Sequence, residues 1–166
     1  FVHSDDQLYS RDTIKNIAEF FIATGADGVY GNLDFVDHED TSKVVRKWIS
    51  NSFQPKTINY GWAPPHPTLF LRKEVYEKYG LFDTSLKISG DYDFMLRIMK
   101  SPDIRLEYLP ETLVKMRMGG ASTGSLNDIL KKKMEDLKVL KRNGFKYPLL
   151  VLSAKNFRKL PQLIKK

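Results

Sequence analysis

The sequence predicts an α/β protein, because segments with helix and strand patterns alternate along the chain. Arg11–Thr24 has apolar side chains at helical spacing, including Ile14, Ile17 and Phe21. Gly28–Val36 is rich in β-forming residues and is bounded by turn residues. Alternation of this kind is typical of a sheet covered by helices. With 166 residues, 42% of them hydrophobic, the chain is long enough for one packed core and too short for two ordinary domains.

The other elements are assigned from apolar spacing and from turn residues. Ser10 is a possible N-cap for the first helix, and Gly25 is expected to end it. Proline and glycine residues between positions 55 and 67 predict a long irregular segment of the kind that is often functional. The further expected elements are helices at Thr41–Ile49, Lys73–Tyr79, Gly90–Lys100 and Asp128–Arg142, strands at Thr68–Leu71, Leu106–Leu109 and Thr112–Met116, and a Lys-rich apolar segment from Pro148 onward.

Composition excludes several classes of protein. The chain has no cysteine, so it contains no disulfide, no thiolate metal site and no cysteine nucleophile. No apolar run approaches the length of about 18 residues that a spanning helix needs. The first residues lack the basic start and long apolar stretch of a signal peptide. We therefore expect a cytoplasmic protein. The charge of its C-terminal part, described next, also suggests peripheral association with the inner face of the plasma membrane.

The formal charge of +7 is concentrated at the C-terminal end. From Asp128 onward there are 12 Lys/Arg and 3 Asp/Glu, a net charge of +9, whereas residues 1–127 have a net charge of −2. We therefore divide the chain into a main domain, 1–127, and a basic amphipathic helical tail, 128–166. The tail either lies on an anionic membrane surface or packs on the domain through Ile129–Leu140. Nucleic acid is not an expected partner, because the main domain is acidic.

Two pairs of carboxylates are candidates for chemistry. Asp5 and Asp6 follow Ser4 at the end of a predicted strand, and two hard oxygen donors there suit Mg²⁺ or Mn²⁺ bound to phosphates. The alternative is that these residues cap the following helix. Asp91 and Asp93 lie in the first turn of a predicted helix, where the helix dipole keeps a carboxylate ionised. Asp91 is the candidate base.

Several further residues are weaker candidates. Asp93 is expected to hold neighbouring amides or to pair with Arg97, four residues on, although both are also candidates for ligand binding. His66 lies in a stiff proline-rich segment and is a candidate to bind the metal, a phosphate or an acceptor. Trp62 is either a platform for a sugar ring or a core residue. Gly119 and Gly120 follow the last strand and predict a lid or a hinge.

Taken in order, these motifs resemble family 2 glycosyltransferases of the GT-A fold, and among them the bacterial enzymes that build surface polysaccharides. The resemblance covers about residues 1–125. It rests on Ser4-Asp5-Asp6, Tyr30-Gly31-Asn32, Pro65–Arg72, Gly80–Asp83, Gly90–Arg97 and Gly119–Ser122.

The resemblance implies a function and roles for residues. It implies the acceptor-side, C-terminal part of a GT-A Rossmann-like domain with a mixed sheet, in a hexosyltransferase that inverts the anomeric centre. It also implies that Asp6 is the direct metal ligand, that Asp5 lies near the ribose or metal, and that Asp91 is the base. Gly90 departs from the acidic residue that is commoner at its position. The partners implied are a nucleotide-sugar donor and a saccharide or lipid-linked acceptor.

The nucleotide-binding strands and helices that precede the Ser-Asp-Asp motif in such enzymes are not among these 166 residues. They would need on the order of 60 or more residues. The alternative function is that of a truncated, non-catalytic transferase that acts as a binding module.

Overall fold

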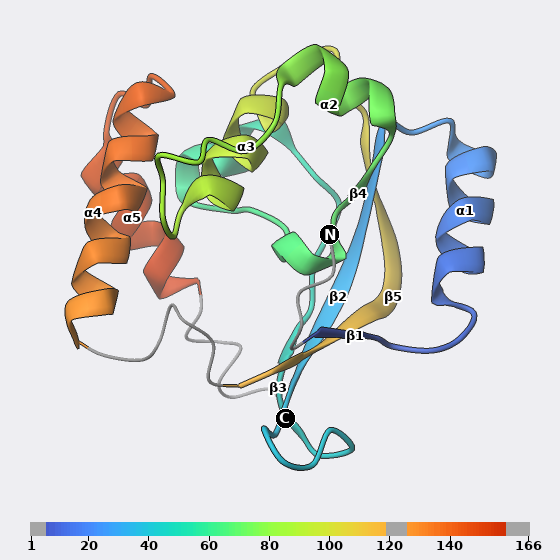
Figure 1. Cartoon of the computed structure of the whole chain (residues 1–166). Helices are drawn as coiled ribbons and strands as arrows, with labels where there is room; N and C mark the ends of the chain where they lie inside the picture. Colours follow the sequence, from blue (N-terminus) through green and yellow to red (C-terminus); the bar gives the residue numbers. More distant parts are fainter. Residues whose placement is uncertain (1–5, 119–125, 159–166) are drawn as a thin grey trace.

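The computed structural model describes residues 6–118 and 126–158, and its strands form one mixed sheet (Figure 1). The central strand β2 is parallel to β5 and antiparallel to both β3 and β4, and β1 is antiparallel to β5. The predicted α/β fold with a mixed sheet is therefore confirmed. The strands are β1 (Asp6–Leu8), β2 (Gly28–Val36), β3 (Val44–Trp48), β4 (Phe70–Leu71) and β5 (Leu106–Arg117).

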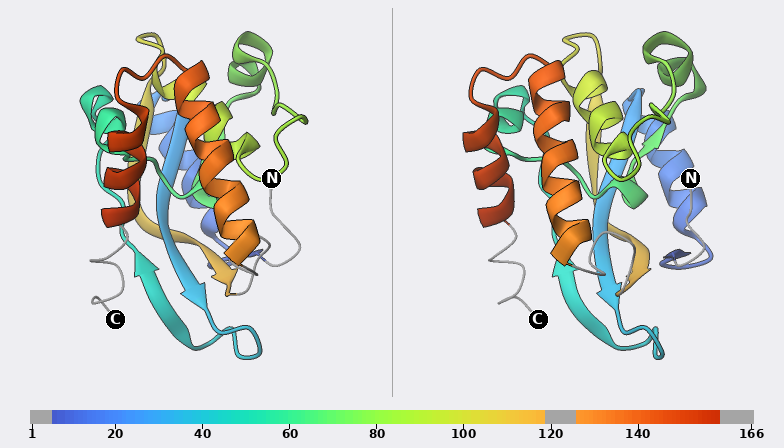
Figure 2. Two further views of the ribbon diagram at one scale, coloured as in Figure 1. Left: turned by 90° about the vertical axis from the view of Figure 1, so that its left-hand side faces the viewer. Right: turned by 60° about the vertical axis from the view of Figure 1, so that its left-hand side comes forward.

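Helices cover both faces of this sheet (Figures 1 and 2). One face is covered by α1, and the other by α3, α4 and α5. The helices are α1 (Thr13–Thr24), α2 (Lys73–Tyr79), α3 (Gly90–Met99), α4 (Leu126–Arg142) and α5 (Pro148–Phe157), with the 3-10 helices η1 (Pro55–Tyr60) and η2 (His66–Thr68).

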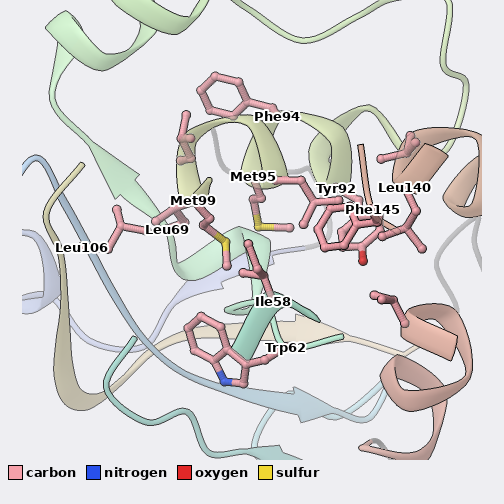
Figure 3. Close-up of a cluster of buried hydrophobic side chains, with 14 of the residues drawn as sticks. Ile58, Trp62, Leu69, Tyr92, Phe94, Met95, Met99, Leu106, Leu140 and Phe145 are labelled. Carbon is pink, nitrogen blue, oxygen red and sulfur yellow. The ribbon is translucent and has the colours of Figure 1, made fainter. Parts of the chain in front are cut away.

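The strand β2 is buried along its whole length because it lies between the two helical layers. Tyr30 points into the cluster under α3, α4 and α5, whereas Val29 and Leu33 pack into the cluster under α1. Figure 3 shows the larger cluster, in which Tyr92 and Met95 from α3 approach Leu140 and Phe145 from the C-terminal part. The sheet therefore supports two cores, one on each face.

Several elements lie where the local pattern predicts them. β2 and α2 have the expected bounds, and α3 ends one residue before the expected position. Gly25 ends α1 with a left-handed φ of 63°, and its N–H donates to the Phe21 carbonyl. Only glycine adopts this conformation without strain, so the predicted stop is confirmed.

The helix expected at Thr41–Ile49 is wrong, because Val44–Trp48 forms the strand β3. β3 pairs antiparallel with the end of β2, so Leu33 lies opposite Trp48. Asp37 closes the connecting turn by accepting hydrogen bonds from the Glu39 and Asp40 N–H groups. Pairing with a buried strand thus overrides a weak local helix pattern.

Other boundaries also differ from expectation, and the strand expected at Thr68–Leu71 is shortened to Phe70–Leu71. The strands expected at Leu106–Leu109 and Thr112–Met116 form one strand, β5, whose register with β2 shifts near Asn32. The first helix has Asp12 rather than Ser10 at its N-cap, and the Ser10 N–H donates to the Thr13 hydroxyl. Asp6, expected at the end of a strand, is the first residue of β1.

The C-terminal helices contribute to the same core as the sheet. Val139 and Leu140 of α4 have no exposed surface, and Phe145 and Val151 join the cluster that contains Tyr30. The core therefore continues across the predicted boundary at residues 127 and 128. Across residues 6–118 and 126–158, no helix has both the length and the apolar character needed to cross a membrane.

Leu140→Ala should lower the free energy of unfolding by about 2–5 kcal/mol, because it leaves a cavity in the shared core. Leu130→Ala is the matched control on the same helix, since Leu130 is 57% exposed, and it should change that free energy by less than about 0.5 kcal/mol. Urea unfolding measures both. Equal effects of the two substitutions would show that α4 does not pack through Leu140.

Candidate functional site

Asp91 and His66 meet at the surface, although they lie 25 positions apart in the sequence. The distance between Asp91 Oδ2 and His66 Nδ1 is 3.8 Å. The Asp91 side chain is 38% exposed and the His66 side chain 17%, and the His66 ring packs edge-on against Phe82. A carboxylate that is open to solvent in the first turn of a helix can accept a proton from a bound hydroxyl group.

His66 is held in place from the central strand of the sheet. It belongs to η2, whose last residue Thr68 is fully buried. The Thr68 hydroxyl lies 3.1 Å from the carbonyl oxygen of Gly31 in β2 and 2.9 Å from that of Pro65. Position 31 in β2 requires glycine, because a Cβ there would lie only 2.6 Å from the Glu111 carbonyl oxygen. The short helix η2, which carries His66, is thus tied to β2 through Thr68.

The loop that leads into Asp91 is held by Glu135 of α4. The Glu135 carboxylate accepts hydrogen bonds from three consecutive backbone N–H groups, those of residues 87, 88 and 89, at 3.2, 2.9 and 2.9 Å. These are the last residues before α3 begins at Gly90. One side chain from α4 therefore fixes the backbone immediately before the candidate base.

Asp136, the next residue of α4, strengthens the same contact. It accepts hydrogen bonds from the Ser89 hydroxyl at 2.7 Å and from Lys155 Nζ of α5 at 2.8 Å. The Lys155 ammonium group also lies 3.2 Å from the centre of the Tyr92 ring, in a cation–π contact. Asp136, Lys155 and Tyr92 thus join α4 and α5 to the first turn of α3.

Both α4 carboxylates are held ionised. Burial alone would raise the pKa of Asp136, but the Lys155 and Lys132 ammonium groups outweigh it and hold that pKa below its usual value. Desolvation is likewise the largest single effect on Glu135, and it is outweighed by the three backbone amides, which lower the pKa of this carboxyl group. Deprotonation of these residues therefore favours the folded state.

Asp93 is the centre of a buried ionic network. Its side chain has no exposed surface and accepts hydrogen bonds from Arg97, Arg142 and Asn143 at distances of 2.6–3.2 Å. The expected pairing of Asp93 with Arg97 is confirmed. Arg97 also donates to the carbonyls of Tyr79 and Leu81. Through these contacts Asp93 and Arg97 join α2, α3 and α4. Because the Asp93 side chain has no exposed surface, its carboxylate cannot contact a saccharide.

Trp62 is a core residue. Its indole stacks on Phe53 with 5.6 Å between ring centroids and meets the edge of Tyr30 at 5.7 Å. The side chain is buried in the cluster under α3. Of the two roles predicted for Trp62, the structure confirms that of a core residue. No open face of the indole is available to stack on a sugar.

Asp6 lies on the sheet rather than on a helix. It is opposite Met116 in the pairing of β1 with β5, and only 8% of the residue is exposed. Among the described residues there is no cluster of three or more His, Asp or Glu side chains that could hold a metal. A metal that is bridged to phosphates needs only one or two protein carboxylates, and both carboxylate oxygens of Asp6 are buried. The other predicted residues here, Ser4, Asp5, Gly119 and Gly120, lie outside the described residues.

The contacts of Glu135 and Asp136 with the loop before α3, and the contacts that Asn32 makes, were not predicted from the sequence. The amide oxygen of Asn32, in β2, accepts hydrogen bonds from the Ser50 N–H and the Tyr108 hydroxyl, both at 2.8 Å. Glu135 and Asp136 lie in a Lys-rich helix and have the appearance of solvated charges. Their partners in the loop before α3 lie 46–48 positions away along the chain, so no local pattern identifies these contacts.

The fold is similar to part of a solved structure. The chain is similar to the crystal structure of residues 1–349 of S. aureus TarS, with a TM-score of 0.54, 15% identity and coverage of 97% of this chain and 46% of that one. A second TarS structure gives a TM-score of 0.50, 15% identity and coverage of 86% and 27%. The chain thus spans less than half the length of either. TarS is a wall teichoic acid glycosyltransferase. No protein-family model and no curated protein sequence matches this chain.

Glu135→Gln should flatten the dependence of stability on pH. The pKa of Glu135 is lowered in the folded state, so its contribution is present above the unfolded pKa of about 4.3 and is lost as the pH falls through the folded value. The free energy of unfolding should therefore fall less between about pH 5 and pH 3 in the variant than in the wild type. Urea unfolding at several pH values measures this, with Glu77→Gln as an exposed control. Identical slopes in the wild type and Glu135→Gln would contradict the role of Glu135.

Proposed function

We propose that the protein takes part in the transfer of a sugar from a nucleotide-diphosphate sugar to a saccharide or lipid-linked acceptor, with inversion, in the synthesis of a cell-surface polysaccharide. The observation that carries this proposal is the exposed Asp91 carboxylate, which is fixed in the first turn of α3 beside His66. The fold shared with TarS supports the same class of reaction. The ordered motifs described above are the basis for assigning it to family 2.

Inversion in one step needs one base on the acceptor side. In the proposed reaction Asp91 accepts the proton of the acceptor hydroxyl while that oxygen bonds to the anomeric carbon and the nucleoside diphosphate departs. The Tyr92 N–H donates to Asp91 Oδ1 at 2.7 Å, which orients the carboxylate, and His66 Nδ1 lies 3.8 Å from Asp91 Oδ2, on the side where the proposal places the acceptor hydroxyl.

We propose Asp6, together with Asp5, as the residues that hold a divalent Mn²⁺ or Mg²⁺ ion. Carboxylate oxygens are suitable ligands for both ions. When bound, the ion neutralises negative charge on the departing diphosphate. Burial of Asp6 against β5 limits its freedom, which favours one orientation of the carboxylate over many.

In a full-length protein that includes the nucleotide-binding part, Asp91→Asn should lower sugar transfer by about 10²–10⁴-fold, because the amide cannot accept the proton. Donor affinity should remain within about twofold, since Asp91 is proposed to act on the acceptor and not on the donor. Product formation from UDP-, GDP- and TDP-linked sugars measures the first quantity, and isothermal titration calorimetry the second. Asp103→Asn, an exposed carboxylate paired with Lys78, is the control. Undiminished turnover in Asp91→Asn would remove Asp91 from the role of base.

In the same full-length protein, removal of divalent metal with EDTA should weaken binding of the nucleotide-sugar donor by at least about tenfold, and Mn²⁺ should restore it. Asp6→Asn should lose the response to Mn²⁺, whereas Asp103→Asn should keep it. The same calorimetric titration with and without Mn²⁺ measures both effects. Donor binding that is equal with EDTA and with Mn²⁺ would contradict a metal site. Absence of metal-dependent donor binding in a protein that includes the upstream nucleotide-binding part would instead favour the non-catalytic binding module.

A further inference from the structure

The helix α4 has an apolar stripe on the side that faces away from the core. The core side of the helix carries Asp136, Val139 and Leu140, all buried. Leu130 and Met134 are 57% and 65% exposed, and Leu137 follows one turn later with its side chain half-buried. Residues at this spacing lie on one face of a helix. The helical spacing of these apolar residues in the sequence is typical of a buried face, but in the structure Leu130 and Met134 are exposed.

Lysine residues flank the stripe. Lys131, Lys133, Lys138 and Lys141 are all exposed, and within the part of the chain that the structure describes none of them forms an ion pair. Lys132, on the core side, is instead paired with Asp136. The two acidic residues in the middle of α4, Glu135 and Asp136, are both turned toward the loop before α3. The outer face of α4 thus has uncompensated positive charge around an apolar centre.

The neighbouring helix α5 adds to the apolar surface. α4 and α5 lie side by side and form the outer layer on this side of the sheet (Figure 2). Leu149, Leu150 and Phe157 of α5 are each at least 65% exposed. Both outer helices therefore expose large apolar side chains.

We propose that the outer face of α4, with Leu130, Met134 and the four lysines, binds the surface of an anionic lipid membrane. An apolar stripe bordered by lysines suits this partner, because leucine and methionine enter the lipid while the ammonium groups remain among the anionic headgroups. A second copy of the chain does not suit the surface, because the lysines of two copies would repel each other. Nucleic acid would satisfy the lysines but not the apolar stripe.

Membrane binding through α4 would also have a consequence for the candidate site. The core side of the same helix holds the loop before Asp91 through Glu135. The helix therefore links the proposed lipid-binding face to the candidate base, and a lipid-linked acceptor would be held at the same membrane. The proposal itself does not depend on catalysis.

Co-sedimentation with vesicles tests the proposal on the whole protein. The wild type should bind vesicles that contain phosphatidylglycerol and not vesicles of phosphatidylcholine alone, and added salt should weaken binding. The triple variant Lys131→Glu/Lys138→Glu/Lys141→Glu should bind anionic vesicles at least about tenfold more weakly. The double variant Leu130→Ser/Met134→Ser should bind more weakly without any change in charge. Lys73→Glu, on α2, is the control for charge and should bind like the wild type.

Asp91→Asn should bind vesicles like the wild type, so a failure of the proposed catalysis is distinguishable from a failure of membrane binding. Far-UV circular dichroism should show that the α4 variants remain folded, since the replaced side chains lie outside the core. The proposal is overturned by equal binding to neutral and anionic vesicles, by binding to neither, or by a loss in Lys73→Glu equal to that in the triple variant. A wild-type dimer in light scattering that becomes a monomer in Leu130→Ser/Met134→Ser would also overturn it.

Discussion

The buried carboxylate of Asp93 is the constraint on which the arrangement of the helices depends. It has no exposed surface, and its partners come from its own helix and from the end of α4, in the form of Arg97, Arg142 and Asn143. Because an unpaired buried charge costs several kcal/mol, α4 cannot separate from α3 without a large loss of stability. Glu135 fixes α4 to the loop before α3 as well. The first turn of α3 is therefore held on both sides.

This arrangement gives two carboxylates in one helical turn different tasks. Asp93 is enclosed and neutralised by arginine, so it acts on structure. Asp91, two residues earlier, keeps an exposed side chain and has His66 as its neighbour. Environment rather than residue type separates the two roles, as it does for paired carboxylates in many enzymes. The basic C-terminal helices are part of this arrangement, because α4 supplies the partners of Asp93 and also the outer face proposed to bind lipid.

The parts of the fold and site that local patterns determine could be predicted from the sequence. Gly28–Val36 and Lys73–Tyr79 have clear patterns and turn residues at their ends, and Asp91 was identified from its place in a helix turn. The strand at Val44–Trp48 could not be predicted, because pairing with β2 decides its conformation. The buried face of α4 could not be predicted either. Asp136 faces the core because Ser89 and Lys155 satisfy its charge, and both are distant in sequence.

The central claim is that the fold holds Asp91 at the point where an acceptor hydroxyl is deprotonated. A crystal structure of the protein with a nucleotide-sugar donor, Mn²⁺ and an acceptor analogue tests it most directly. The account predicts that the reacting hydroxyl lies within about 2.6–3.2 Å of the Asp91 carboxylate, with Asp93 still bound to Arg142. A bound acceptor whose reacting hydroxyl meets another base, or that displaces Arg142 from Asp93, would contradict the account.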